Sequence, residues 1–244
     1  MQWNRSQWTP LQWTPLLTGV IAAAALAACG SVLASAQTSV AASLFGAFNQ
    51  STSGNGTAQS PANAAGALLE LRHISSPLFG YEVTYSYNRA NQSLGPAGTV
   101  GYPALCVGPG PCTNSTSTAA ISSNANELTG DWVVSFKLAN LRPFALAGAG
   151  LLRDSPTGGT VTTTTYSAGT APPALTTAAA ATSASTKAVL VYGAGLDWGL
   201  LPHIGLRLQY RGNLYKAPAL AKAFSSTGAF MQTAEPAIGA YFNF

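Results

Sequence analysis

The amino-acid sequence predicts an all-β fold, an eight-stranded antiparallel up-and-down transmembrane β-barrel that follows a cleaved signal peptide. Several segments alternate apolar and polar side chains with a period of two residues, which is typical of a strand with a different solvent on each face. Only 7% of the 244 residues are charged, against about 25% in ordinary soluble domains. Beyond the N-terminal region, no uninterrupted apolar run is long enough for a membrane helix. Low charge without such a helix is compatible with a membrane barrel, whose apolar surface is hidden in the alternation.

Five segments show the alternation clearly. In His203–Tyr215 the apolar face comprises Ile204, Leu206, Leu208 and Tyr210, and the polar face comprises Arg207, Gln209, Arg211 and Asn213. The same pattern occurs in Tyr81–Asn88, Leu128–Leu138 and Leu190–Trp198. The last segment, Ala237–Phe244, places on one face Ile238, Ala240, Phe242 and Phe244. Each segment is therefore predicted to be a strand.

Three further strands rest on weaker patterns. Ala67–Arg72 alternates, but Leu68 interrupts its polar face. Phe144–Leu152 is rich in alanine and glycine, so the pattern leaves its facing open. Ser39–Phe48 is predicted mainly because a strand is needed before the first long connection. The total is then eight strands.

The connections between these strands alternate between long and short. The short ones are His73–Leu78, Ala139–Pro143 and Gly199–His203, and the long polar ones are Asn49–Asn63, Asn91–Asn126, Arg153–Lys187 and Lys216–Glu235. An up-and-down barrel with both termini in the periplasm has this order, with short periplasmic turns and longer extracellular loops. A structureless loop of about thirty residues would be unusual in a compact soluble domain. Within the last long connection, Ala217–Phe224 is expected to form a short helix.

The N-terminal residues resemble an export signal. Arg5 precedes a mostly apolar stretch from Leu16 to Leu33, and Ala34-Ser35-Ala36 has the small residues of a cleavage site. We therefore predict a signal peptide over residues 1–36 and a barrel domain over residues 37–244. The same segment contains Leu26-Ala27-Ala28-Cys29, which is similar to a lipobox, so acylation of Cys29 is the alternative.

The polar faces of the predicted strands carry four acids and four bases: Glu70, Arg72, Glu82, Asp131, Lys137, Asp197, Arg207 and Arg211. In a closed barrel of eight strands these side chains would point into an interior just wide enough to hold them. Buried charges are tolerated when they are paired. The balance therefore predicts a lumen filled by ion pairs, and a conducting channel is the alternative.

Cys106 and Cys112 flank a turn rich in glycine and proline. In an oxidising compartment a disulfide that closes this small loop is the favoured interpretation, with free thiols as the alternative. A metal site would need neighbouring histidine or acidic ligands, which this segment lacks.

Together these features resemble the small OmpA/OmpX-type eight-stranded bacterial outer-membrane barrels. The residues that carry the resemblance are the Phe-terminated last strand and the two Gly/Ala-rich segments 143–150 and 193–199. The resemblance implies a monomer in the lipid of the outer membrane of a Gram-negative-type bacterium. It also implies that the barrel-assembly machinery reads the last strand through Ile238, Ala240, Phe242 and Phe244. The family contains anchors, adhesins, small channels and a few enzymes, so membership alone assigns no activity.

Catalysis is not predicted. Only His73 and His203 are available as histidine catalysts, and both fall at short turns, on the side opposite the extracellular rim. No phosphate-binding loop, metal cluster or nucleophile elbow is present, so no cofactor is expected. The basic residues are scattered despite a net charge of +4, which argues against nucleic-acid binding. The remaining hypotheses are a structural or surface-interaction barrel without catalysis, a small transport barrel, and a secreted soluble β-sandwich adhesin.

Overall fold

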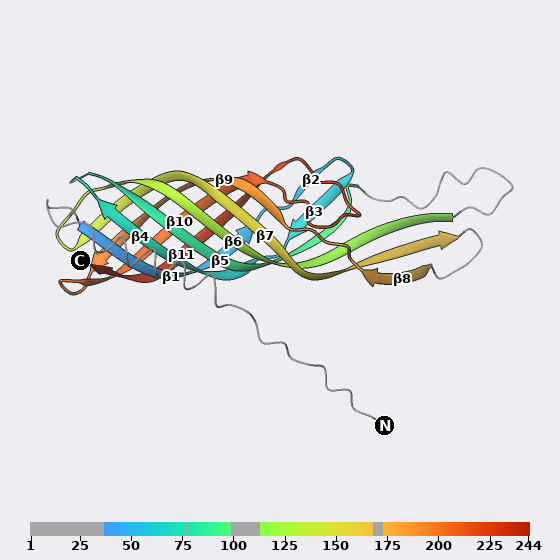
Figure 1. Cartoon of the computed structure of the whole chain (residues 1–244), viewed down its shortest axis with the longest axis horizontal. Helices are drawn as coiled ribbons and strands as arrows, with labels where there is room; N and C mark the ends of the chain where they lie inside the picture. The colour runs from blue at the N-terminus through green and yellow to red at the C-terminus, as the bar shows by residue number, and fades with distance from the viewer. Residues whose placement is uncertain (1–36, 77, 99–112, 168–172) are drawn as a thin grey trace, which may run out of the picture. The chain divides into compact units, whose positions relative to one another are not determined.

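A computed structural model describes residues 37–76, 78–98, 113–167 and 173–244 (Figure 1). Within these ranges the regular structure consists of eleven strands. They are β1 (Gln37–Asn49), β2 (Thr52–Gly54), β3 (Thr57–Pro61), β4 (Ala64–Ile74), β5 (Phe79–Pro96), β6 (Thr113–Ser135), β7 (Leu141–Ser167), β8 (Ala174–Ala179), β9 (Ser185–Gly199), β10 (Ile204–Lys216) and β11 (Phe230–Asn243). None of the described residues belongs to a helix with the length and apolar character needed to cross a membrane.

Eight of the strands form a closed antiparallel barrel. Each pairs with the next in the order β1, β4, β5, β6, β7, β9, β10 and β11, and β11 pairs back to β1. The closing register sets Ser39 opposite Asn243, and the Phe244 N–H donates to the Thr38 carbonyl oxygen at 2.9 Å. The predicted eight-stranded up-and-down barrel is therefore confirmed, and the barrel leaves no strand edge unpaired.

The two ends of the barrel differ in their connections. The connections from β4 to β5, from β6 to β7 and from β9 to β10 are short and lie on the end where β1 begins and β11 finishes, which we call the short-turn rim. The opposite end, which we call the long-strand end, holds the hairpin of β2 and β3 and the projecting parts of β6, β7 and β8 (Figure 1).

The long connections are shorter than expected, because much of their sequence is strand. Residues 91–96 continue β5, residues 113–126 belong to β6, and residues 153–167 belong to β7. Their β-branched and small polar residues pair along the whole of β6 and β7, from Ser135 opposite Phe144 to Thr113 opposite Ser167. The prediction that residues 91–126 and 153–187 are loops was wrong for these parts.

The helix expected over Ala217–Phe224 is also absent from the structure. This segment extends over the lumen at the long-strand end, where Leu220 is fully buried beside Leu94 and Ile121. Its backbone pairs with residues 181–183: the Ser183 N–H donates to the Leu220 carbonyl and the Lys222 N–H to the Ala181 carbonyl. Pro218 disfavours helical geometry at the residue before it and lacks a backbone donor. The sheet-like pairing is therefore favoured over a helix in this segment.

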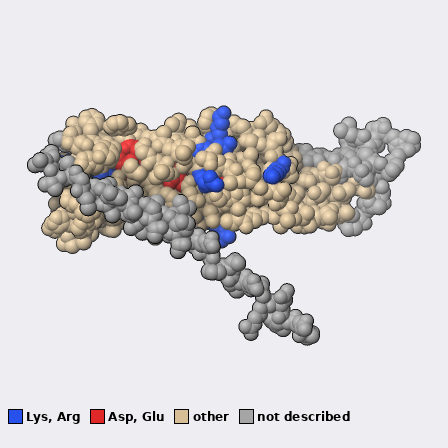
Figure 2. Space-filling model, in the orientation of Figure 1, with Lys and Arg blue, Asp and Glu red and all other residues tan. Residues whose placement is uncertain are grey.

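The outer face of the barrel carries many large apolar side chains. In the view of Figure 2, charged side chains cover little of the described surface. Large exposed side chains occur on the barrel strands and their turns, and include Leu44, Phe48, Tyr81, Trp132, Leu151, Leu190, Leu208, Ile238 and Phe242. On β10 the alternation is as expected, with Ile204, Leu206, Leu208 and Tyr210 outside and Arg207, Gln209, Arg211 and Asn213 buried. The apolar sides of the strands therefore face outward.

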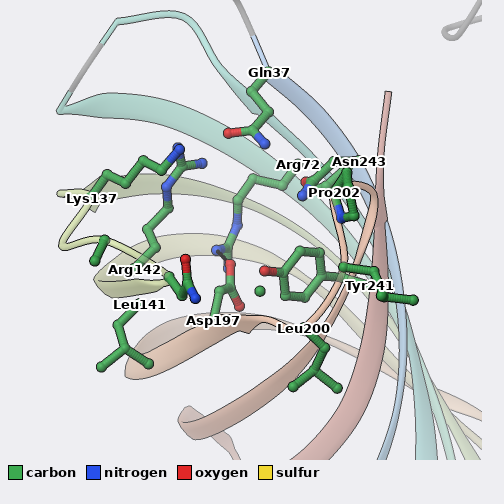
Figure 3. Close-up of a pocket in the computed structure, with 15 residues that line it drawn as sticks. Gln37, Arg72, Lys137, Leu141, Arg142, Asp197, Leu200, Pro202, Tyr241 and Asn243 are labelled. Atoms are coloured by element: carbon green, nitrogen blue, oxygen red, sulfur yellow. Dashed lines mark hydrogen bonds and ion pairs between the residues drawn. The ribbon is translucent and has the colours of Figure 1, made fainter.

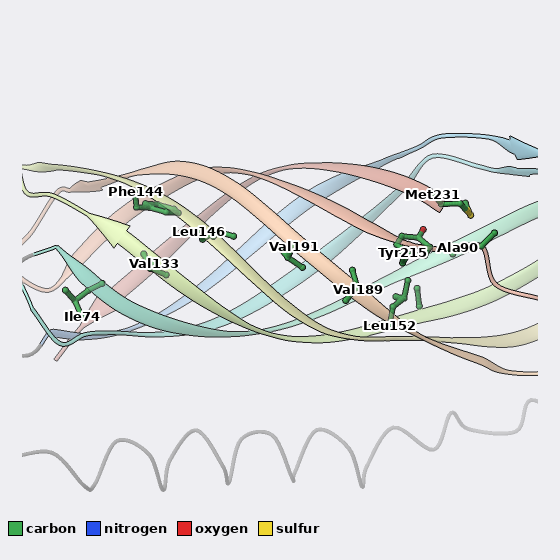
Figure 4. Packing of buried hydrophobic residues seen from close by; sticks show 12 residues of the cluster. Ile74, Ala90, Val133, Phe144, Leu146, Leu152, Val189, Val191, Tyr215 and Met231 are labelled. Carbon is green, nitrogen blue, oxygen red and sulfur yellow. The ribbon is translucent and has the colours of Figure 1, made fainter. Parts of the chain in front are cut away.

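The lumen is lined unevenly. The inner faces of β5 and β10 are mostly polar, and that of β4 is mixed. In contrast, β7 and β9 contribute buried apolar residues, among them Phe144, Leu146, Val189 and Val191 (Figure 4). This assigns the strand whose facing was left open: from Phe144 to Asp154 the even-numbered residues of β7 point inward. Leu68, which interrupts the polar face of β4, packs with Phe45 and Ala47 inside the lumen.

Inward aromatic rings lie against glycines of the neighbouring strand. Phe144 is the register partner of Gly195, and Tyr241 is the partner of Gly205. A Cβ atom placed on Gly195 would lie 2.4 Å from Phe144 Cζ, and one on Gly205 would lie 2.4 Å from Tyr241 Cζ. The missing side chains thus allow each ring to cover the adjacent backbone.

Replacing Gly195 with alanine is expected to lower the free energy of unfolding by about 1–3 kcal/mol, because the Phe144 ring must move within a packed lumen. Urea-induced unfolding of the folded barrel in detergent measures the change. Gly130→Ala is the matched control, because a Cβ on Gly130 meets no atom within 4 Å. Equal stability of the two variants would show that the ring has room to move.

Candidate functional site

Inside the lumen, two to four residues from the strand ends at the short-turn rim, lies a compact group of charged side chains. We call it the central ion cluster, and it is formed by Arg72, Arg207, Glu70, Glu82 and Asp197. The strand register places Arg72 opposite Glu82 and Arg207 opposite Asp197. Arg72 Nε lies 2.7 Å from Glu82 Oε2, and Arg207 Nε lies 2.7 Å from Asp197 Oδ1. Both arginines are 1% exposed, so these pairs are sequestered from bulk water.

The cluster also links opposite sides of the barrel. Arg72 Nη1 reaches Asp197 Oδ2 at 3.0 Å, and Arg207 Nη1 lies 3.3 Å from Glu82 Oε2 and 3.4 Å from Glu70 Oε2. These contacts connect β4 and β5 with β9 and β10, which are not neighbours in the sheet. The ion pairs therefore cross the lumen near the short-turn rim.

Neutral groups add further contacts to this cluster. Gln209 Nε2 donates to Glu70 Oε1 at 2.7 Å, and the Ser43 hydroxyl donates to Glu70 Oε2 at 3.1 Å. The guanidinium carbon of Arg72 lies 3.9 Å from the centre of the Phe144 ring. Hydrogen bonds and a stacked ring are what a buried charge needs in order to offset its loss of water.

A second group of charges lies nearer the long-strand end. Arg211 Nη2 lies 3.2 Å from Glu127 Oε1, and Asn213 Nδ2 donates to Glu127 Oε2 at 3.0 Å. The Thr129 hydroxyl donates to Asp131 Oδ2 at 3.1 Å. Because this second group contains one arginine and several carboxyl groups, its formal charge is negative.

The distribution of charge over the whole barrel differs from the expected balance of four acids and four bases. The chain has seven aspartates and glutamates, and all seven are buried: Glu70, Glu82, Glu127, Asp131, Asp154, Asp197 and Glu235. The fully buried cations are Arg72, Arg207 and Arg211. Lys137 is not one of them. It follows the end of β6, its side chain is exposed, and it has no ion pair with another described residue.

Sequence reasoning missed three of the buried carboxylates, Glu127, Asp154 and Glu235. Each lies in or directly beside a segment expected to be a loop. The two-residue alternation nevertheless indicated that they face inward, because Glu127 continues the inward series of Thr129 and Asp131. Asp154 likewise continues the inward series of Leu152. Lys137 has the inward parity too, but the strand ends at Ser135, so parity no longer determines where its side chain points.

The remaining predicted residues are placed as follows. Ile238, Ala240, Phe242 and Phe244 all point outward and are exposed. His73 Nδ1 is 2.9 Å from the Thr38 hydroxyl, and His203 Nδ1 is 3.1 Å from the Asn243 carbonyl, both at the short-turn rim. Cys29, Cys106, Cys112 and the expected signal peptide lie outside the described residues. Among the described residues, no group of three or more His, Cys, Asp or Glu could hold a metal ion.

A closed eight-stranded barrel with an apolar exterior and a filled, charged interior has the architecture of the small outer-membrane β-barrels. Similar solved structures include Ail, the attachment invasion locus protein of Yersinia pestis, crystallised with a heparin analogue, at 12% identity and a TM-score of 0.44. This likeness covers 86% of the present chain and 99% of Ail.

Two other outer-surface barrels show the same degree of likeness. Neisserial surface protein A is 13% identical over 85% of this chain and 97% of that protein, with a TM-score of 0.43. The outer membrane protein OprG of Pseudomonas aeruginosa is 11% identical over 85% of this chain and 95% of that protein, with a TM-score of 0.44. No family model and no curated protein matches the chain. Likenesses this distant assign no function.

Replacing Arg207 with methionine is expected to lower the free energy of unfolding by about 3–5 kcal/mol, because Asp197 and Glu82 lose a buried partner while the volume is largely kept. Urea-induced unfolding in detergent measures the change. Lys222→Met removes an exposed cation without an ion pair in the described structure and serves as the control. A loss for Arg207→Met no larger than that for the control would show that the cluster does not hold the barrel together.

Proposed function

We propose that this protein is an integral outer-membrane β-barrel with a side-chain-filled lumen, which has a structural or surface-interaction role and no catalytic activity. The observation that carries the proposal is the inverted polarity of the barrel. All seven carboxylates are inside, while large apolar side chains cover the outside. A soluble protein has the opposite arrangement, with charged residues exposed and apolar residues enclosed.

The exterior supports a bilayer as the surrounding medium. The apolar residues continue around the closed sheet, and Trp132, Trp198, Phe242 and Phe244 lie outward near the short-turn rim. Aromatic residues at the edge of an apolar band are typical of membrane barrels. Because the hydrocarbon core offers no hydrogen-bond partners, only a sheet without free edges is stable there. The pairing of β11 with β1 meets this condition.

The interior favours a structural barrel over the alternative of a small channel. The central ion cluster crosses the lumen, and Leu146, Val189 and Val191 fill the part of the interior beside β7 and β9. Residues 217–221 cover the lumen at the long-strand end. A solute would have to displace each of these layers.

The long-strand end supports a role in surface interaction. β6, β7 and β8 form a sheet that projects past the end of β5, since the pairing of β5 with β6 stops at Leu94 opposite Ala119. Among the described strands β8 pairs only with β7, and all six of its residues are exposed. Open strand edges can pair with an extended segment of another protein. Comparing cell adhesion by the full chain with that by a chain lacking residues 113–118 and 162–179 measures what the projecting sheet contributes to surface interaction.

Orientation and assembly belong to the same proposal. The short-turn rim and both ends of the barrel domain would face the periplasm, and the long-strand end would face outside. The outward residues of β11 would be the signal that the barrel-assembly machinery reads, and the inserted protein would be a monomer. Pulse-labelled insertion of a chain lacking Phe244 measures how much this signal contributes to assembly. His73 and His203 have local hydrogen bonds at the short-turn rim, which supports a structural role for both.

Tryptophan fluorescence tests the membrane assignment. A chain without residues 1–36 retains only Trp132 and Trp198, and both are outward, with Trp132 76% exposed. In vesicles whose lipids carry bromine on the acyl chains, this fluorescence is expected to be strongly quenched, because the indole rings would contact the chains. Phe144→Trp in a background without the other two tryptophans is the inward control and should be quenched much less. Equal emission in brominated and ordinary lipid for the outward tryptophans would contradict the proposal.

Single-channel recording tests the filled lumen. The protein inserted into a planar bilayer is expected to show no steady openings, because the ion pairs and apolar side chains leave no continuous aqueous path. A known porin inserted into the same bilayer shows that the recording would detect a conducting pore. Steady conductance that scales with the number of inserted barrels would favour the transport alternative.

A further inference from the structure

A cavity of about 340 Å³ opens at the short-turn rim, where the lumen begins (Figure 3). Its wall is built from the ends of β1 and β11 and from the turns that join β6 to β7 and β9 to β10. Arg142 lies at the start of β7 with the inward parity of Phe144, and Lys137 lies in the preceding turn. In Figure 3 the ends of these two side chains lie on the same side of the cavity.

Within the described residues, the two cations form no ion pair. Lys137 is exposed and Arg142 is half-buried, and neither forms a hydrogen bond or an ion pair with the side chain of another described residue. Two like charges that line one cavity repel each other, and the repulsion is stronger where the protein excludes water. An anion between them would relieve it.

No aspartate or glutamate side chain in the described structure forms an ion pair with either cation. Asp197 is the one acid among the residues that line the cavity. It already accepts from Arg72 Nη1 at 3.0 Å, from Arg207 Nε at 2.7 Å and from Arg207 Nη2 at 3.0 Å. The other six acids are buried elsewhere in the lumen. The cavity therefore offers both cations to an anion from outside the chain.

The rest of the lining indicates which kind of anion fits. Tyr241 and Asn140 offer a hydroxyl and an amide, and in Figure 3 the Tyr241 hydroxyl points into the cavity. The outer margin is apolar, because Leu141, Leu200 and Leu201 also line the cavity and are 40%, 49% and 63% exposed. Polar donors and two cations beside an exposed apolar margin suit an amphiphile with an anionic head.

We propose that this cavity binds the phosphate group of an anionic phospholipid, whose acyl chains would lie against the apolar margin. Arg142 would donate two parallel hydrogen bonds to phosphate oxygens, and Lys137 would add a point charge. The lipid source rests on the proposed function, which places this rim at a membrane surface. A free phosphate ion would satisfy the same cations but would not use the leucines.

The test compares binding of two probes to the full chain in detergent micelles. Short-chain phosphatidylglycerol is titrated and the bound complex is counted by native mass spectrometry, and inorganic phosphate is titrated by calorimetry. Lys137→Gln/Arg142→Gln is expected to weaken phosphatidylglycerol binding at least about tenfold, since each charge-assisted hydrogen bond contributes roughly that factor or more. Arg89→Gln/Lys222→Gln is the control with the same change in charge at exposed positions away from this cavity, and it should bind as the parent does.

Each outcome decides the proposal. Phosphatidylglycerol bound more tightly than inorganic phosphate, with loss only in the Lys137/Arg142 variant, supports the lipid site. Equal binding of both probes with the same loss would overturn the lipid source and assign the cavity to free phosphate. Equal binding by the two double variants overturns the site itself.

Two further measurements separate folding and membrane insertion from binding. Lys137→Arg/Arg142→Lys keeps both charges and should retain binding, and the heat-dependent gel mobility of every variant shows whether the barrel is folded. Because the titrations are made in micelles, a negative result leaves the bromolipid quenching untouched. Absence of quenching in vesicles would overturn the membrane assignment without changing what the micelle titrations report.

Discussion

The pairing of β1 with β11 is the interaction on which the rest of the structure depends. It joins the two ends of the barrel domain, so every strand of the barrel has a neighbour on both sides. Because a closed sheet has an inside and an outside, the period-two alternation of each strand assigns its residues to one of two separate solvents. If the pair opened, two strand edges would be exposed and the enclosed charges would meet whatever surrounds the sheet. Closure of the sheet therefore also separates the polar faces of the strands from their apolar faces.

Enclosing every carboxylate has a cost that the lumen offsets locally. Taking charges out of water is unfavourable, and buried ion pairs are weak evidence for net stability. Here the ion pairs instead make one register of the strands more favourable than the others. Arg72 and Arg207 each contact acids on strands across the lumen, so a shift in the register of β4 or β10 would break several contacts at once. The glycines of β9 and β10 allow Phe144 and Tyr241 to lie beside these arginines, within 3.9 Å of Arg72 and 5.7 Å of Arg207, respectively.

The two ends of the lumen are finished in different ways. At the long-strand end the segment that includes Leu220 lies over the interior and is held by backbone pairing with residues 181–183. At the short-turn rim a polar cavity remains, with Lys137 and Arg142 on its wall. Because the aspartates and glutamates are all internal, the described cations outside the lumen have no ion pair with them. An unpaired cation at a membrane surface finds its partner in the surrounding lipid or solution, which is the basis of the lipid site we propose.

The sequence by itself determined the fold class, the number of barrel strands and the outward face of most of them. The reason is that alternation and turn length are local properties, and a one-residue slip would reverse the face of every side chain. Local pairs across a short turn, such as Asp197 with Arg207, follow from the same register. Where the strands end did not follow, so Lys137 was placed inside, Glu127, Asp154 and Glu235 were missed, and a helix was expected over residues 217–224.

Only the tertiary structure decided which charges meet across the lumen and which stay without a partner. Arg72 finds Asp197 from β4 to β9, a contact between residues 125 positions apart, because the closed sheet brings opposite walls within reach of two long side chains. The facing of β7 likewise depended on its neighbours, since its alanines and glycines carry little polarity of their own. Local pattern determines the faces of a strand, whereas its partners across an enclosed space depend on the closure of the whole sheet.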